Sequence, residues 1–93
     1  MKKSYIYFMA NKNNTVIYIG VTSNLLERVQ QHKIKIHTGF TASYNCDKLV
    51  YFEEFENMNH AIAREKQLKA GNHKRKEALI ELENPSWKDL SKG

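Results

Sequence analysis

Two segments near the start of the chain are rich in aromatic and β-branched residues, a composition typical of β-strands. They cover residues 5–9 and 15–20, and the asparagine-rich turn between them suits a hairpin. Residues 49–55 form a third such segment. It stays apolar on both faces until its glutamates, which predicts a central strand. Alternation along it groups Leu49, Tyr51, Glu53 and Phe55 on one face, opposite Val50, Phe52 and Glu54.

The first predicted helix begins after Asn24, whose side chain can cap the free amide groups of the first turn. Arg28 precedes His32 by one helical turn, so their side chains are expected to be neighbours. The pattern ends at Thr38-Gly39-Phe40-Thr41. Its apolar face is predicted from the helical spacing of Leu25, Val29, His32 and Ile36.

Two more helices are predicted in the second half of the chain. Asn57 or Asn59 caps the first of them, which runs to Ala70 and stops at Gly71. Asn72 can cap the other, which runs to about residue 82 and ends before the Asn84-Pro85 pair. The last helix is expected to turn Ala78, Leu79 and Leu82 inward, and Trp87 and Leu90 are expected to fold back on the core.

Several residues in these elements have side chains that phosphodiester cleavage can use. Tyr5, Tyr7 and Tyr18 carry phenols on predicted strands, and Arg28 carries a guanidinium on the following helix. The alternative is structural, because aromatic residues also fit a half-buried sheet. A histidine on an apolar helix face, such as His32, is likewise often a packed or hydrogen-bonded residue.

Glu65 interrupts an otherwise apolar stripe of the second-to-last helix, three residues from Ile62 and from Leu68. A carboxylate facing a core is costly unless it is neutralised. A divalent cation would neutralise it, since Mg²⁺ is often held by one or two carboxylates together with phosphate and water. An ordinary helical ion pair with Arg64 or Lys69 is the alternative.

Composition favours an anionic partner. The 93 residues predict one domain, 1–93, with a formal net charge of +5. No apolar run reaches the ~18 residues of a membrane span, and a single cysteine excludes an internal disulfide, which together predict a cytoplasmic protein without a membrane partner. The basic residues are expected to form a solvated face, or to contact nucleic-acid phosphates without base specificity. They are Arg64, Lys66, Lys69, Lys74, Arg75 and Lys76.

The order and spacing of these residues resemble the GIY-YIG endonuclease superfamily over nearly the whole chain. Tyr5-Ile6-Tyr7 and Tyr18-Ile19-Gly20 are similar to the two tripeptides of the family, and Arg28 follows at the family's distance. Residues 61–69 resemble the helix that carries the family's metal-binding glutamate. Further fragments resemble short stand-alone bacterial members of the family: Gly39-Phe40-Thr41, Leu49-Val50-Tyr51 and residues 84–90.

This resemblance implies an α+β fold, a three-stranded antiparallel sheet flanked by helices in the order β-β-α-β-α-α. It also implies metal-dependent hydrolysis of DNA phosphodiester bonds, in repair or recombination, with RNA as a further possible substrate. Tyr7 and Tyr18 would orient or deprotonate water, and Arg28 would stabilise charge on the phosphorane. Glu65 would hold one Mg²⁺ or Mn²⁺ ion, and His32 would assist.

Two positions depart from the family pattern. Tyr5 replaces the glycine of the first tripeptide, and the family's late asparagine maps only loosely onto Asn84. Specificity would come from this domain, from a homodimer or from a partner protein. The alternative to an enzyme is a non-catalytic nucleic-acid-binding module that keeps the nuclease fold.

Overall fold

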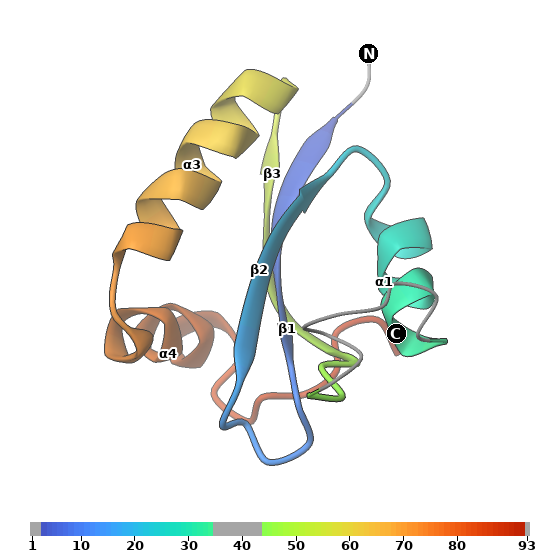
Figure 1. Ribbon diagram of the computed structural model, residues 1–93, viewed down its shortest axis with the longest axis vertical. Coiled ribbons are helices and arrows are strands. Elements are labelled where there is room, and N and C mark those ends of the chain that lie inside the picture. The colour runs from blue at the N-terminus through green and yellow to red at the C-terminus, as the bar shows by residue number, and fades with distance from the viewer. Residues whose placement is uncertain (1–2, 35–43, 93) are drawn as a thin grey trace.

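The computed structural model describes residues 3–34 and 44–92 of the chain. Residues 36 and 38–41, which enter the predictions for the first helix and the resemblance, lie outside the described residues. The order of the described elements is the predicted β-β-α-β-α-α (Figure 1). Their bounds are β1 Ser4–Ala10, β2 Ile17–Thr22, α1 Leu25–Lys33, β3 Lys48–Phe55, α3 Met58–Ala70 and α4 His73–Glu83.

The three strands form an antiparallel sheet in the order β2-β1-β3, so β1 is central and β3 is an edge strand. The prediction of a central third strand is therefore wrong. Its two apolar faces have another cause. Phe8 pairs with Tyr51 and Met9 with Leu49, so Val50 is an extra residue in β3. The bulge breaks the alternation and turns Leu49 and Tyr51 to opposite faces of the sheet.

Helices cover both faces of the sheet, with α3 and α4 on one side and α1 on the other (Figure 1). The period of two along β1 divides its residues between these faces. Ile6 and Phe8 pack with Leu68 of α3 and Ile80 of α4, whereas Tyr7 packs with Val29 of α1. One consequence is that Tyr7 and the end of α1 share a face.

The predicted caps Asn24 and Asn72 are confirmed, and of the two candidates for α3 the cap is Asn57. The side chains of Asn24, Asn57 and Asn72 accept hydrogen bonds from backbone amides in the first turns of α1, α3 and α4. Each cap satisfies one amide that the helix leaves without a partner. Because each cap fixes where its helix starts, the positions of Arg28 and Glu65 along their helices follow from the sequence.

The predicted inward face of α4 is confirmed for Leu79 and wrong for Ala78 and Leu82. Ile80 is fully buried and Leu79 is partly buried, but Ala78 is exposed and Leu82 is 79% exposed. The helix rests on the sheet through the side that carries Ile80, which turns the Ala78–Leu82 stripe away from the core. Trp87 does fold back on the core, while the side chain of Leu90 stays 40% exposed.

No helix among the described residues has the length and apolar character needed to cross a membrane.

Candidate active site

The site is built around Tyr7, whose side chain lies across the edge strand β2. Tyr7 and Gly20 are direct partners in the β1–β2 register, and Tyr7 is fully buried. A Cβ atom on Gly20 would lie 2.4 Å from the Tyr7 hydroxyl oxygen and 2.5 Å from Cζ. Gly20 therefore provides the space that the tyrosine ring occupies, a function that the sequence pattern alone did not reveal.

We expect Gly20→Ala to destabilise the protein by about 1–3 kcal/mol, because the added methyl group overpacks a rigid aromatic contact. The displaced Tyr7 ring should also lower any catalytic rate. Gly71→Ala is the matched control, since a Cβ there meets its nearest neighbour, the Leu68 carbonyl oxygen, at 3.4 Å. Thermal melts of both variants would test this, and equal melting temperatures would contradict the packing role of Gly20.

Three rings from three different elements meet at this point. The ring centroids of Tyr7 and Tyr18 are 6.3 Å apart, and that of His32 lies 5.6 Å from Tyr7 and 5.5 Å from Tyr18. The Tyr7 hydroxyl oxygen is 2.9 Å from Nε2 of His32, which is a hydrogen bond. The structure thus brings two strand tyrosines and the α1 histidine into one cluster.

The charges of Arg28 and Glu65 act on the same Tyr7 hydroxyl. Burial raises the pKa of Tyr7 to about 12, and the neighbouring Tyr18 phenol adds to the rise. Arg28 lowers that pKa through its charge and its hydrogen bonding, whereas the Glu65 carboxylate raises it. Positive charge near a phenol ordinarily makes it more acidic. In the protein alone burial outweighs Arg28, so Tyr7 stays protonated at neutral pH.

Glu65 is both a carboxylate that faces the core and a member of a helical ion pair, the two alternatives that its sequence position left open. Its side chain is only 17% exposed, on a helix that packs against β1 and β2. Its Oε2 atom lies 3.5 Å from Nζ of Lys69, an ion pair with i, i+4 spacing. Arg64 does not contribute to that pair. A mostly buried carboxylate therefore lies near enough to the tyrosine cluster to act on the pKa of Tyr7, with one lysine as its counter-ion.

A divalent cation would find one carboxylate here. No group of three or more His, Cys, Asp or Glu side chains that could hold a metal occurs among residues 3–34 and 44–92. Mg²⁺ sites commonly use one or two carboxylates and complete their coordination with water and substrate phosphate. Glu65 fits that kind of site, in which the metal binds together with the substrate.

The six predicted phosphate-binding residues differ in their surroundings. The Arg64 guanidinium donates to both carboxylate oxygens of Glu53, at 2.9 and 3.0 Å, and to Gln67 at 2.7 Å. Lys69 and Lys76 line a hollow of ≈ 290 Å³ beside Tyr18. Lys66, Lys74 and Arg75 are exposed. Lys69 and Lys76 are therefore the pair best placed to contact a phosphate near the tyrosines.

Asn84 has a structural position. It is buried, and its side-chain amide donates to the carbonyl oxygens of Val50 and Lys88 at 3.1 and 2.8 Å. Its Oδ1 atom accepts from the Lys88 amide at 3.1 Å. These bonds tie the end of α4 to β3, the strand farthest from β2, so Asn84 is not part of the tyrosine cluster.

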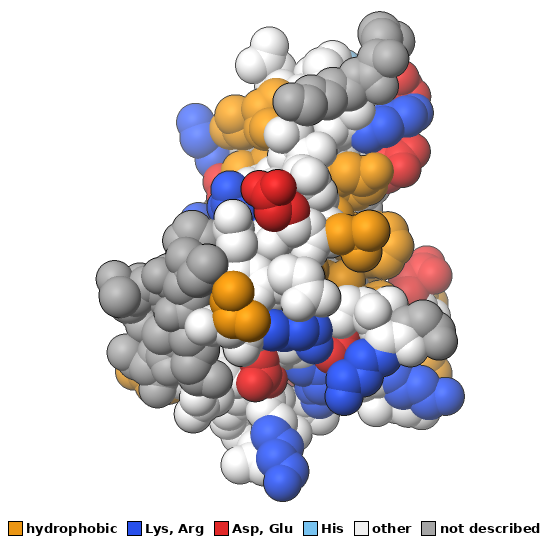
Figure 2. All heavy atoms as spheres, turned by 90° about the vertical axis from the view of Figure 1, so that its right-hand side faces the viewer, with side chains coloured by type: hydrophobic (Ala, Val, Ile, Leu, Met, Phe, Trp, Pro, Cys, Tyr) orange, Lys and Arg blue, Asp and Glu red, His pale blue; other side chains and the backbone are white. Residues whose placement is uncertain are grey.

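A second group of lysines, not anticipated from the sequence, lies where the β1–β2 turn approaches the C-terminal segment. Figure 2 shows Lys and Arg side chains gathered in the lower part of the α1 face, with acidic side chains among them. Lys33 pairs with Asp89 and also donates to the Asp47 carbonyl oxygen at 3.0 Å. These contacts offset part of the positive charge and anchor α1 to the C-terminal segment. The residues that line the hollow at this place are Lys12, Lys33, Asp47, Lys48, Asp89 and Lys92.

Comparison with known proteins identifies the family. Residues 3–78 match the family model of the GIY-YIG catalytic domain. A UPF0213 protein of Clostridium perfringens is 35% identical over 77 residues, which cover 83% of this chain and 82% of that protein. A UPF0213 protein of Syntrophus aciditrophicus is 33% identical over 86 residues, covering 91% and 97%.

The chain belongs to the GIY-YIG family, whose catalytic domain is of the nuclease type, and its relatives are about as short as it is. The fold has been solved for a similar protein. The solution NMR structure of a UPF0213 protein from Bacillus halodurans superposes with a TM-score of 0.59 at 22% identity, covering 97% of this chain and 95% of that one. The predicted family and fold class are confirmed.

Proposed function

We propose that this protein is a divalent-metal-dependent endonuclease that hydrolyses phosphodiester bonds of DNA. The observation that carries the proposal is that four groups from three elements, β2, α1 and α3, act on the Tyr7 hydroxyl. His32 hydrogen-bonds it, Tyr18 lies beside it, and Arg28 and Glu65 act on its pKa with opposite sign. A phenol, an imidazole, a guanidinium and a carboxylate supply the proton transfer and charge stabilisation that such a reaction needs.

Tyr7 and His32 can move a proton together. A phenol with a pKa of about 12 is a poor base by itself at neutral pH. With Nε2 of His32 unprotonated, the Tyr7 hydroxyl can donate to it across 2.9 Å. As the Tyr7 oxygen takes a proton from the attacking water, its own proton passes to His32. The phenol then relays the proton and never has to exist as a free phenolate.

Arg28 and Glu65 would act on the phosphate. The Arg28 guanidinium would donate to the oxygens on which negative charge builds up in the transition state. Glu65 would hold the divalent cation, which supplies Lewis-acid stabilisation of that charge when it is bound. Lys69, released from Glu65 by the cation, would remain beside Tyr18 as a phosphate contact.

The test is incubation of the purified chain with labelled linear, nicked and branched DNA, with Mg²⁺ or Mn²⁺ and with chelator. Cleavage that requires the cation supports the proposal. A protein that binds these DNAs in a salt-dependent manner without cutting them would instead be a nucleic-acid-binding module that has kept the fold. An RNA panel in the same assay would decide between the two nucleic acids.

Replacing either tyrosine with phenylalanine should lower the cleavage rate sharply, because each change removes the hydroxyl and keeps the ring. Tyr7→Phe should have the larger effect and should also alter the pH–rate profile, since it interrupts the relay to His32. Tyr51→Phe is the control, because Tyr51 lies on the opposite face in the α3-side core. If all three variants cleave like the wild type across pH, the tyrosines are packing residues only.

Tyr7→Phe should also change how the stability of the protein depends on pH. The folded-state pKa of about 12 lies above the ordinary tyrosine value of 10. Neutral Tyr7 therefore contributes stability that is complete below pH ~10 and is lost as the pH rises towards 12. Between neutral pH and pH ~12, the free energy of unfolding of Tyr7→Phe should therefore decrease by on the order of 2 kcal/mol less than that of the wild type. Denaturant titrations at neutral and alkaline pH would measure it.

A further inference from the structure

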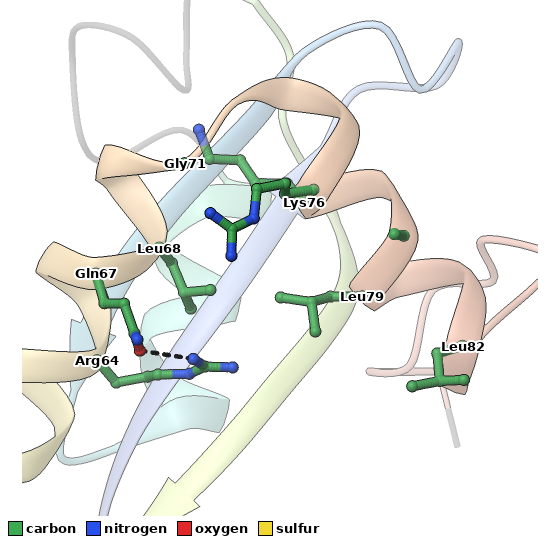
Figure 3. A pocket seen from close by; sticks show the side chains of 9 residues that line it. Arg64, Gln67, Leu68, Gly71, Lys76, Leu79 and Leu82 are labelled. Atoms are coloured by element: carbon green, nitrogen blue, oxygen red, sulfur yellow. Dashed lines mark hydrogen bonds between the residues drawn. The ribbon is translucent and has the colours of Figure 1, made fainter.

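A large hollow lies between α3 and α4. It has a volume of ≈ 570 Å³, and both helices line it with residues at positions i, i+3, i+4 and i+7 (Figure 3). The α3 side is Arg64, Gln67 and Leu68, followed by Gly71. The α4 side is Arg75, Ala78, Leu79 and Leu82, with Lys76 next to them.

The α4 side of the hollow is largely apolar, and of its residues Leu79 packs partly against the core, whereas Ala78 and Leu82 do not. Ile80 anchors α4 to the sheet, whereas Ala78 is exposed and Leu82 is 79% exposed. The facing wall is held in place, since Arg64 is hydrogen-bonded to Glu53 and Gln67. Apolar side chains at helical spacing beside a fixed wall are typical of a surface that receives another helix.

Charge along α4 indicates which helix would fit. Lys74, Arg75 and Lys76 occupy its first turn, and Glu81 and Glu83 its last. The first turn has no acidic residue and the last turn no basic residue, the reverse of what the helix dipole favours. A second copy of α4 laid antiparallel would place the basic end of each helix against the acidic end of the other.

The register of such a pair follows from the sequence. The stripe from Arg75 to Leu82 is symmetric about the Ala78–Leu79 position, so an antiparallel copy places Leu82 opposite the stem of Arg75. The twofold axis keeps each flank of the stripe on the same side of the pair, so residues on one flank of one copy face residues on the same flank of the other copy. On the outer flank, Lys74 would meet Glu81 of the second copy, and both side chains are exposed in this structure.

We propose that the α3–α4 groove is a homodimer interface in which two copies pack α4 against α4 about a twofold axis. Such an interface is self-complementary, as a twofold axis requires. Nucleic acid is the less suitable occupant for two reasons. The lining residues include no aromatic side chain on which a base could stack, and the leucines at the α4 end of the groove offer a phosphate no hydrogen-bond donor. The proposal does not depend on catalysis.

Sedimentation equilibrium of the full chain tests it. The interface is small, so we expect a dimer dissociation constant on the order of 10–100 µM. The weight-average mass should rise from 10.9 kDa towards twice that value with concentration. Leu82→Ser should weaken association at least tenfold. Leu26→Ser is the matched control, because Leu26 is a 72% exposed leucine on α1, and it should have no effect.

Charge reversal tests the antiparallel register. Lys74→Glu and Glu81→Lys should each weaken association, and the double variant should restore it, because the pair is then reversed on both copies. A chain that stays monomeric at ~500 µM, or equal effects of the Leu82 and Leu26 variants, would overturn the interface. Failure of the double variant to recover would overturn the register. Loss of DNA affinity in Leu82→Ser without a change in mass would assign the groove to nucleic acid.

Discussion

Glu65→Gln is expected to abolish metal-dependent DNA cleavage while leaving the fold and most DNA binding intact. Glutamine keeps the shape of the side chain and removes the negative charge that a divalent cation needs. The ion pair with Lys69 has a separation of 3.5 Å, and the lysine side chain is 53% exposed. Its loss should therefore cost less than about 1 kcal/mol. Removing a mostly buried charge also relieves a desolvation cost in the metal-free protein.

Thermal melts with and without Mg²⁺ separate the metal role from a structural one. The wild type should gain stability with the cation, because only the folded state presents the site, and Glu65→Gln should not. Glu77→Gln is the control. Glu77 Oε2 lies 3.8 Å from Nε2 of His73 at the same spacing on the neighbouring helix α4, a contact that is an ion pair only when His73 is protonated. Cleavage by Glu65→Gln at the wild-type rate would rule out Glu65 as the metal ligand.

The local features of this fold could be predicted from the sequence because short-range chemistry determines them. An asparagine followed by apolar residues at helical spacing favours a capped helix, and Asn24, Asn57 and Asn72 each cap one. The two tyrosine-bearing strands are likewise specified by their composition and by the turn between them. These elements carry Tyr7, Tyr18, Arg28 and Glu65, so the candidate residues were identifiable.

What could not be predicted depends on contacts between elements. Apolar residues on both faces of residues 49–55 indicated a central strand, but a bulge at Val50 produces the same pattern on an edge strand. The apolar stripe of α4 was recognised, yet nothing local distinguishes a stripe that meets the core from one that faces a groove. Which side of α4 rests on the sheet is decided by Ile80.

The electrostatics of the site were also beyond the sequence. The sequence shows positive charge near Tyr7, which alone would lower the pKa of a phenol, but sequence spacing does not reveal burial. In the structure Tyr7 lies under Gly20 with no exposed surface, and desolvation becomes the largest influence on its pKa. The hydrogen bond to His32 then gains importance, since it offers a protonated phenol a route for its proton.

Arg28→Ala should reduce activity far more than affinity. A guanidinium directed at charge that develops only in the transition state acts mainly on kcat, and its loss should cost roughly 10²–10³-fold. Arg28 also lowers the pKa of Tyr7, so its removal should raise that pKa and shift the pH–rate profile towards alkaline pH. Arg28→Lys should restore little, because a point charge lacks the planar fork of two donors.

Steady-state kinetics at several pH values distinguish this role from simple phosphate binding. Lys66→Ala provides the control, since Lys66 is an exposed basic residue on α3, and its loss should change only KM and its salt dependence. The decisive comparison is the division of the Arg28→Ala effect between kcat and KM. A raised KM with unchanged kcat and an unchanged pH profile would make Arg28 a ground-state phosphate contact. The charge stabilisation at the cluster would then have to come from Lys69, Lys76 or the bound cation.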